Sequence, residues 1–298
     1  MDSTKSENAN VILVLSGGGA KGVALAGALV ALEENGIPID RIVGCSIGSF
    51  IGALYAYYGN AVIVADKSRG VKTEDLIDIP WYNYYRLFLS NKGLTIGKNF
   101  EQILSHQLSD IDIKDLDIPM SIITTDLDTL ELYEICEGNL ITAVRASCAL
   151  PPYFAPVKFH NKLLIDGGIA SPLPTEIAQK YSPKVIISIN LSSYVIQKNN
   201  NSMVNIMLRM LEGSYYNSVE RQEQLADIAI KIKLPVGVTD TVHNEVLYHE
   251  GYVKTLETIP EIKKMLEKHK IDLKSLQKHE KREIEHNIRN ILELRDDV

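Results

Sequence analysis

The stretch Gly-Cys-Ser-Ile-Gly at residues 44–48 lies between a short apolar run at 42–43 and the small, apolar segment Phe-Ile-Gly-Ala-Leu at 50–54. This G-x-S-x-G pentapeptide predicts a sharp turn from a strand into a helix, with a strained serine whose hydroxyl points out of the fold. Glycine is needed on both sides of the serine, because side chains there would collide with the neighbouring strand and helix. The pentapeptide alone occurs by chance in many chains, so its meaning depends on its surroundings.

A second glycine-rich stretch lies upstream of this turn. An apolar strand is predicted over residues 10–15, followed by Ser-Gly-Gly-Gly-Ala-Lys-Gly at 16–22 and a helix to about Leu32. Residues 41–43 predict the second strand, and residues 46–58 the helix after the turn. Two strand–loop–helix units in so short a length indicate parallel strands with right-handed crossovers, and therefore an α/β sheet.

The remaining elements follow from apolar runs and helical periodicity. The predicted strands are 120–125, 130–135, 163–165, 185–189 and 228–232, and the predicted helices are 99–107, 140–147, 175–180 and 204–224, with a polar loop at 197–202. From Leu247 onward the pattern is helical and charged, with Pro260 predicted to divide it. This organisation predicts one domain over 9–245 and a C-terminal helical extension over 246–298 that packs on it.

Composition narrows the class of protein. The 298 residues carry a net charge of -7, which excludes the basic footprint of a nucleic-acid-binding protein. Three cysteines without C-x-x-C spacing predict free thiols in a reducing, cytoplasmic compartment and no zinc site. Residues 42–65 contain no charge, but their glycines and the serine turn favour a buried strand, turn and core helix over a membrane span. The polar start predicts no signal peptide, so membrane contact is expected only at the inner surface.

An exposed serine needs a base for its proton and donors for the negative charge on the attacked carbonyl. Gly17, Gly18 and Gly19 precede a helix, so their amides are predicted to point one way at the positive end of its dipole. The same residues match the dinucleotide fingerprint G-x-G-x-x-G, but Asp40 lies before the second strand and not at its end. An oxyanion loop is therefore favoured over a dinucleotide-binding oxidoreductase.

Asp166 is the candidate base. It follows the buried strand pattern at 163–165 and precedes Gly167 and Gly168, at the carboxyl end of a strand, where α/β sheets gather active-site groups. An aspartate before glycine is most often a turn or cap residue, so this pattern does not decide the role by itself. None of the seven histidines lies in a glycine-framed turn; they are His106, His160, His243, His249, His269, His279 and His286.

Taken together, the segments at 16–22, 44–48 and 166–168 resemble, in order and spacing, the patatin-like phospholipases. Ala-Ser-Cys-Ala-Leu-Pro at 146–151 is similar to the family's Ala-Ser-x-Ala-x-Pro segment, and Ser-Pro-Leu-Pro at 171–174 to its Asn-x-Pro continuation. The resemblance implies a three-layer α/β fold with a mostly parallel central sheet and flanking helices. It covers residues 10–190 strongly.

The resemblance also implies a Ser-Asp dyad that cleaves carboxyl esters of (lyso)phospholipids or related lipids, without a metal or cofactor. Ser46 would be the nucleophile, Asp166 the base, and Gly17, Gly18 and Gly19 the oxyanion hole, supported by Lys21, Gly22, Gly44, Gly48, Gly167 and Gly168. Lys21 stands where many members have Arg, Cys45 where many have Thr, and Ile47 where many have Ala. Cys45 is predicted to point away from the site as a packed residue, and Ile47 to add bulk near the oxyanion site.

Two further segments bear on lipid contact. The aromatic stretch at 81–89 predicts either a lid over Ser46, at the mouth of an acyl pocket, or a helix packed on the core. Residues 263–282 hold eight Lys/Arg against three Asp/Glu, which favours a solvated helix face over a membrane-binding arm.

Two alternatives remain at this stage. One is a Ser-His-Asp esterase or thioesterase, in which His243 or His249 completes the triad after Asp166. The other is a patatin fold that serves as a binding or regulatory protein, because a fold does not guarantee turnover.

Overall fold

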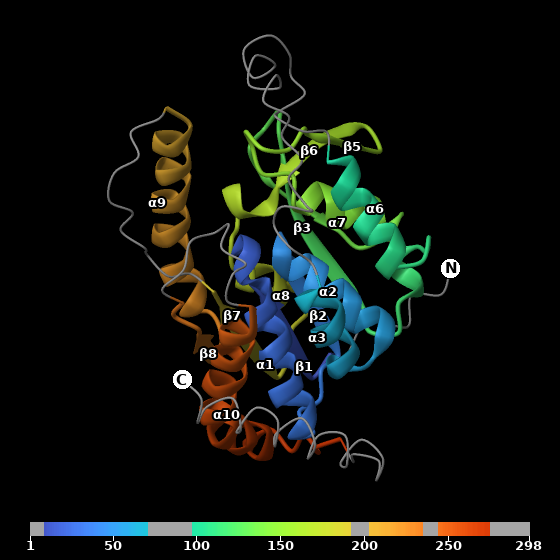
Figure 1. The fold of residues 1–298 in the computed structure, drawn as a ribbon. Coiled ribbons are helices and arrows are strands. Elements are labelled where there is room, and N and C mark those ends of the chain that lie inside the picture. Colours follow the sequence, from blue (N-terminus) through green and yellow to red (C-terminus); the bar gives the residue numbers. More distant parts are fainter. Residues whose placement is uncertain (1–8, 71–96, 192–202, 235–243, 275–298) are drawn as a thin grey trace.

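In the computed structural model, which describes residues 9–70, 97–191, 203–234 and 244–274, an eight-stranded sheet forms the centre of the fold (Figure 1). Its strands are β1 (Val11–Leu15), β2 (Arg41–Cys45), β3 (Met120–Asp126), β4 (Leu132–Ile135), β5 (Val157–Phe159), β6 (Lys162–Asp166), β7 (Val185–Asn190) and β8 (Ile228–Lys231). The order is β5-β6-β3-β2-β1-β7-β8, with β4 paired to β3. The pairs among β3, β2, β1, β7 and β8 are parallel, whereas those of β4, β5 and β6 are antiparallel.

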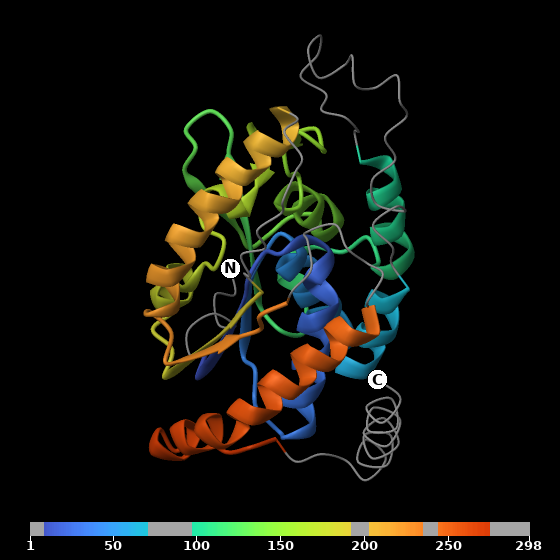
Figure 2. The same cartoon turned by 60° about the vertical axis from the view of Figure 1, so that its left-hand side comes forward.

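Helices cover both faces of the sheet and give three layers (Figures 1 and 2). One face packs against α1 (Gly22–Glu34), α2 (Ile47–Tyr58), α3 (Ala61–Arg69), α6 (Lys98–Gln107), α7 (Leu140–Ser147) and α10 (Asn244–Lys268), and the other against α8 (Thr175–Lys180) and α9 (Met203–Glu223). In β1, Leu13 and Leu15 belong to the first core and Ile12 and Val14 to the second. Because both faces are covered, these strands are apolar along their whole length.

The predicted three-layer α/β fold with a mostly parallel sheet is confirmed, and the predicted helices and strands in the described residues lie close to their predicted ranges. The aromatic stretch at 81–89, the polar loop at 197–202 and the end of the basic segment from 275 lie outside the described residues.

The charge-free stretch at 42–65 contains one more element than predicted. The helix that follows Ser46 ends at Tyr58, and α3 begins at Ala61. Gly59 ends α2 in the left-handed conformation, with φ of 61°, and the Asn60 side chain accepts a hydrogen bond from Ile63 N at 3.0 Å. A glycine C-cap followed by an asparagine N-cap separates two helices, and Gly59-Asn60 is a local signal for this boundary.

The prediction that Pro260 divides the C-terminal helix is wrong, because α10 continues through it. Proline costs about 3 kcal/mol inside a helix, since it lacks an N–H and clashes with the preceding turn. Here Thr255 and Ile259 on one side of Pro260 and Ile262 and Leu266 on the other are all buried. Their packing on one continuous face outweighs the local cost.

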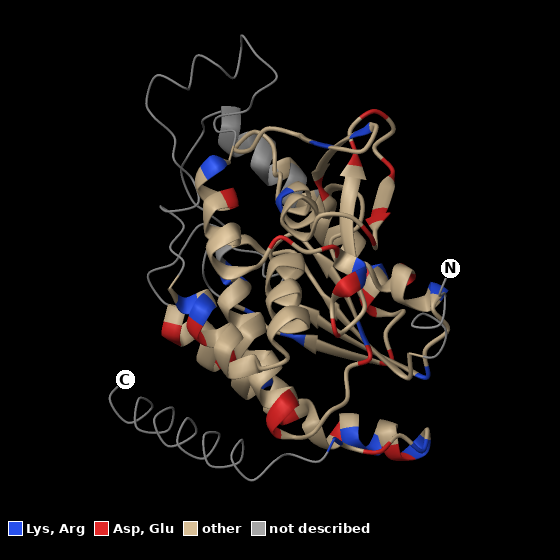
Figure 3. Ribbon diagram, turned by 90° about the vertical axis from the view of Figure 1, so that its right-hand side faces the viewer, with Lys and Arg blue, Asp and Glu red and all other residues tan. Residues whose placement is uncertain are grey.

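The described part of the predicted extension lies directly against α1. A Cβ on Gly251 of α10 would lie 1.9 Å from Ala24 O, and a Cβ on Gly27 of α1 would lie 2.1 Å from Tyr248 O. The two helix backbones therefore touch. Toward its C-terminal end, α10 carries Lys/Arg and Asp/Glu interspersed (Figure 3). None of the helices in the described ranges is long and apolar enough to cross a membrane.

Candidate active site

Ser46 lies in the turn between β2 and α2, with φ of 51° and ψ of -124°. A residue other than glycine rarely adopts this conformation, so the surrounding structure must enforce it. A Cβ on Gly48 would lie 2.5 Å from Leu15 O, and one on Gly44 would lie 2.7 Å from Gly48 O. Both glycines of the pentapeptide are therefore required by close backbone contacts, as the sequence predicts.

The Ser46 hydroxyl donates a hydrogen bond to Asp166 Oδ2 at 2.7 Å. The other carboxylate oxygen, Oδ1, accepts from Gly168 N at 2.8 Å. Asp166 is only 4% exposed, and this burial raises the pKa of its carboxyl from 3.8 to about 6, although both hydrogen bonds favour the charged form. The carboxylate is thus oriented toward the serine and is more basic than an aspartate in water.

The strand that places Asp166 differs in direction from the one that its sequence context indicates. Asp166 ends β6, which runs antiparallel to β3, so its strand does not share the carboxyl edge of the parallel strands. Instead, Asp166 pairs in register with Thr124, next to Ile123, which pairs with Cys45 of β2. The register of two neighbouring strands therefore places the carboxylate beside Ser46.

The backbone of Asp166 is held on both sides. Its N–H donates to Ala149 O at 3.0 Å, and its carbonyl accepts from the Thr125 hydroxyl at 2.8 Å. A Cβ on Gly167 would lie 2.2 Å from Ile123 O, so the following turn packs directly on β3. These contacts leave the Asp166 side chain little freedom to move away from Ser46.

The glycine loop passes alongside Ser46, since a Cβ on Gly17 would lie 3.4 Å from Ser46 Cβ. The prediction that all three amides are open to the site is not met at Gly17. Its N–H donates to Pro172 O at 3.0 Å, and its carbonyl accepts from the Tyr215 hydroxyl at 2.7 Å. Within the described part of the chain, the N–H groups of Gly18 and Gly19 meet no acceptor, and they lie where the loop enters α1. These two amides are the candidate oxyanion donors.

The other predicted positions lie close by. Lys21 is buried, 4% exposed, just before α1. A Cβ on Gly22 would lie 2.2 Å from Ile47 Cγ1, so Ile47 covers the start of that helix. Cys45 is fully buried under the Asp166 turn, and burial raises the pKa of its thiol. A protonated, enclosed thiol is a packed residue, as expected, but its sulfur lies against the turn after Asp166 and does not point away from the site.

Two alternatives receive no support from the described residues. His249 is half-buried on α10, and no histidine in the described part of the chain hydrogen-bonds to Ser46 or Asp166, while His243 lies outside it. Asp40, the acidic residue nearest to a ribose-binding position, accepts instead from the amides of Asn10 and Val11, both at 2.9 Å. Its carboxylate caps the start of β1, at the opposite end of that strand from the glycine loop.

Sequence analysis missed three residues that surround the pair. Ser147 accepts from Ser46 N, Thr125 binds the Asp166 carbonyl, and Tyr215 binds the Gly17 carbonyl. Ser147 belongs to the quoted Ala-Ser-x-Ala-x-Pro segment, so a signal for it was present. Thr125 and Tyr215 carry no local signal.

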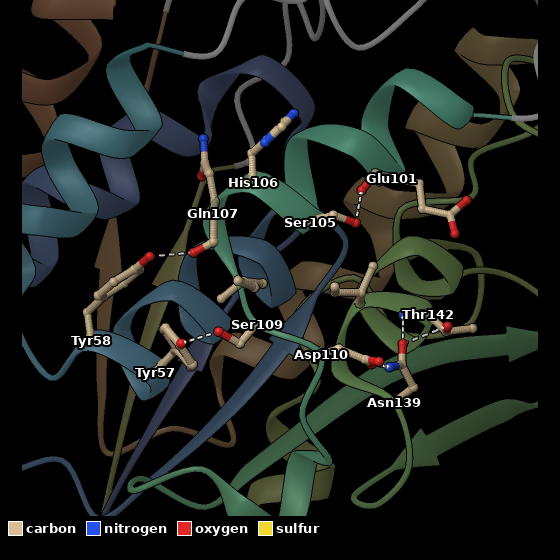
Figure 4. A pocket seen from close by; sticks show the side chains of 12 residues that line it. Tyr57, Tyr58, Glu101, Ser105, His106, Gln107, Ser109, Asp110, Asn139 and Thr142 are labelled. Carbon is tan, nitrogen blue, oxygen red and sulfur yellow. Dashed lines mark hydrogen bonds between the residues drawn. The ribbon is translucent and has the colours of Figure 1, made fainter.

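A separate cavity of about 600 Å³ lies between the end of α2 and the helices α6 and α7 (Figure 4). Tyr57 and Tyr58 line it, and their hydroxyls bond to Ser109 Oγ and to Gln107 O. No predicted site residue lines this cavity. Ser46 lies at the other end of α2, about 17 Å away at the usual helical rise. The cavity is therefore distinct from the candidate active site.

Comparison with known proteins finds relatives that are named as patatin-like phospholipases and a lysophospholipase. The chain is 36% identical over 186 residues to "Patatin-like phospholipase domain-containing protein 6" of Mus musculus, covering 61% of this chain and 14% of that protein. It is 32% identical over 188 residues to "Lysophospholipase NTE1" of Scheffersomyces stipitis, covering 62% of this chain and 12% of that protein. The chain thus spans about one seventh of the length of these relatives, or less.

A solved structure shares the fold. VipD from Legionella pneumophila superposes with a TM-score of 0.54 at 15% identity, over 85% of this chain and 67% of that one. The family model described as "Patatin-like phospholipase" matches residues 13–178, more than half of the chain. This match spans the glycine loop, the serine turn and Asp166, and it confirms the resemblance drawn from these motifs. The chain belongs to the patatin-like phospholipase family.

Proposed function

We propose that this protein is a serine acyl hydrolase that cleaves carboxyl esters of phospholipids or lysophospholipids through Ser46 and Asp166. The observation that carries the proposal is the 2.7 Å hydrogen bond from the Ser46 hydroxyl to a buried carboxylate. Family membership supports the reaction type, and a relative named lysophospholipase supports the substrate class.

In the first step, Ser46 Oγ attacks the ester carbonyl carbon while its proton passes to Asp166 Oδ2. The pKa of Asp166, about 6, lies nearer to neutral pH than that of an ordinary aspartate. The carboxylate is therefore a stronger general base. The oxygen of the tetrahedral intermediate becomes negative. The amides of Gly18 and Gly19 are the donors that would stabilise it, at the start of α1.

In the second step, the protonated Asp166 gives its proton to the leaving alcohol oxygen, and the carbon–oxygen bond of the ester breaks. The acyl group is then bonded to Ser46. Water attacks this acyl-enzyme, Asp166 takes a proton from the water, and the fatty acid leaves as Ser46 recovers its proton. Asp166 supplies this last proton, so the same carboxyl acts as base and then as acid in each half of the reaction.

Product analysis tests the proposal directly. Purified protein is incubated with phospholipid vesicles and lysophospholipid micelles, and released fatty acids are measured by mass spectrometry beside the Ser46→Ala variant. Fatty acid is expected from the wild-type protein only, and an organophosphonate probe is expected to label Ser46 alone. Absence of Ser46-dependent release from these lipids and from p-nitrophenyl esters would contradict the proposal and favour a binding module.

A histidine variant separates the dyad from a triad. The double variant His243→Ala/His249→Ala is expected to keep wild-type turnover, because Asp166 contacts Ser46 directly. Loss of turnover in this folded variant would favour the Ser-His-Asp alternative.

A further inference from the structure

Ser147, the last residue of α7, forms a hydrogen-bond bridge inside the core beside Ser46. Its hydroxyl oxygen accepts a hydrogen bond from Ser46 N at 2.8 Å, and the same hydroxyl donates to Ile123 O at 2.6 Å. The residue is fully buried. One small side chain therefore connects the backbone of the serine turn to the central strand β3.

The turn needs such an anchor because Ser46 has an unfavourable backbone conformation, with φ of 51°. Conformations of this kind persist only where the surrounding contacts determine them. The Ser46 N–H supplies one half of the restraint on this residue, because it donates a hydrogen bond to the Ser147 hydroxyl. The Ser46 carbonyl supplies the other half, since it accepts from Ser49 N at 2.8 Å and from the Ser49 hydroxyl at 2.6 Å.

The same short segment also restrains Asp166. Ala149, two residues after Ser147, accepts a hydrogen bond from Asp166 N at 3.0 Å. The Ile123 carbonyl that Ser147 binds is also the atom on which Gly167 packs. The end of α7 therefore contacts the backbone of both residues whose side chains meet at 2.7 Å.

We propose that Ser147 is a positioning residue for the reaction: its hydroxyl fixes the Ser46 backbone so that Ser46 Oγ faces Asp166. This inference rests on the proposed function. Ser147 acts through Ser46 and is not itself proposed to contact substrate, so its removal is expected to affect the chemical step more than substrate binding.

Ser147→Ala tests the inference, because it leaves the Ser46 N–H and the Ile123 carbonyl without this partner. With a soluble p-nitrophenyl ester, kcat is expected to fall about 10- to 100-fold while KM changes by no more than about twofold, since small displacements of a nucleophile cost rate. Labelling of Ser46 by an organophosphonate is expected to slow by a similar factor.

Ser188→Ala is the matched control. Ser188 is also fully buried in the core, in β7, but within the described residues its hydroxyl has no hydrogen-bond partner. This variant removes the same atom from a comparable environment, so kcat is expected to stay close to the wild-type value. Equal losses of kcat in the two variants, or an unchanged kcat in folded Ser147→Ala, would overturn the inference.

Different results would contradict the proposed function and the positioning role of Ser147. If the wild-type protein shows no Ser46-dependent hydrolysis, the proposed function fails. If the wild-type protein is active and Ser147→Ala keeps its kcat, only the positioning role fails. Should Ser147→Ala not fold, Ser147→Cys decides, because a thiol fills the space but is a weak acceptor. A kcat reduced about tenfold then supports the role, and a wild-type kcat overturns it.

Discussion

At the scale of single residues, Asp166 combines burial with a direct contact to Ser46, and the two features have separate consequences. Burial alone would favour the neutral acid, which cannot accept a proton. The hydrogen bonds from Ser46 and Gly168 oppose this effect, and the resulting pKa of about 6 keeps the carboxylate charged at neutral pH. Asp166 is therefore a charged base at physiological pH, with a pKa only slightly below that pH.

This pKa predicts the pH dependence of the reaction. Because the charged form of Asp166 is the base, kcat/KM is expected to be constant above about pH 7 and to fall about tenfold for each pH unit below about 6. The measurement is kcat/KM for a soluble p-nitrophenyl ester across this range. An imidazole would give a similar midpoint, but its midpoint shifts markedly with temperature, whereas that of a carboxyl hardly shifts. A strongly temperature-dependent midpoint would contradict an aspartate base.

Asp166→Asn is expected to abolish turnover and to raise the free energy of unfolding. The raised pKa means that the folded protein binds the proton of Asp166 more tightly than the unfolded chain, so stability falls as pH rises from about 4 to about 6. Above that range the buried charge costs up to about 3 kcal/mol, the equivalent of a shift from 3.8 to about 6. Asparagine removes this cost, because its amide can donate to Ser46 Oγ and accept from Gly168 N.

Urea unfolding measures this effect. The variant is expected to be more stable than the wild type at about pH 7.5, and the difference is expected to vanish below about pH 3, where the wild-type carboxyl is neutral in both states. A variant less stable than the wild type at about pH 7.5 would show that the native contacts of the charged form outweigh its burial.

The residues of the site differ in how far they could be predicted from the sequence. Ser46 and Asp166 stand out because glycines beside them mark sharp turns, a signal contained in a few consecutive residues. The engagement of the Gly17 amide and carbonyl depends on Pro172 and Tyr215, which are remote in sequence. Such contacts exist only once the sheet has formed, so no local sequence pattern predicts them. The same reason applies to the hydrogen bond from the Thr125 hydroxyl to the Asp166 carbonyl.

At the scale of helices and strands, local patterns predicted most elements, and tertiary packing explains the exceptions. The short strand β5 was not predicted because its three residues, Val157–Phe159, are too few to show an alternation. Pro260 was expected to break a helix that its packing preserves. In both cases the contacts with neighbouring elements outweigh the preference of the local sequence.

The close contact between α1 and α10 leads to a prediction on stability. Gly251→Ala would place a methyl group 1.9 Å from Ala24 O, so the two helices must move apart. A loss of about 1–3 kcal/mol is expected, the usual cost of forcing extra volume into a packed contact. Gly213→Ala on α9 is the control, because a Cβ there has no atom of the described structure within 4 Å. This control is expected to gain up to about 1 kcal/mol from helix propensity.

Chemical denaturation of both variants checks this prediction. Equal stabilities of Gly251→Ala and Gly213→Ala would mean that α10 can shift away from α1 without cost. Ala24 lies two residues after Gly22, at the end of α1 that carries the candidate oxyanion loop, so activity at low denaturant shows whether a displaced α1 also disturbs the site.

At the scale of the whole molecule, α10 decides whether the predicted catalytic part, residues 9–245, could fold alone. The division between this part and residues 246–298 stays a prediction. The boundary falls inside α10, which begins at Asn244. Leu247, Tyr248 and Ile262 of this helix are among the residues of the larger core. The same core includes α1, which carries the candidate oxyanion loop at its start, so the packing of α10 and the geometry of the site are linked.

A chain that ends at residue 245 is therefore expected to aggregate or to lose cooperative unfolding, because it exposes the apolar face of α1. Each apolar side chain of α10 that leaves the core forfeits about 1.5–3 kcal/mol, and the stability of a typical domain is only about 5–15 kcal/mol. A chain that ends at Lys274 retains every contact described for α10, so it is expected to unfold cooperatively and to keep its Ser46-dependent activity. Thermal unfolding and ester hydrolysis of the two truncated proteins provide the comparison. A folded, active chain ending at residue 245 would show that α10 is dispensable for folding. It would also show that other residues can bury the apolar face of α1.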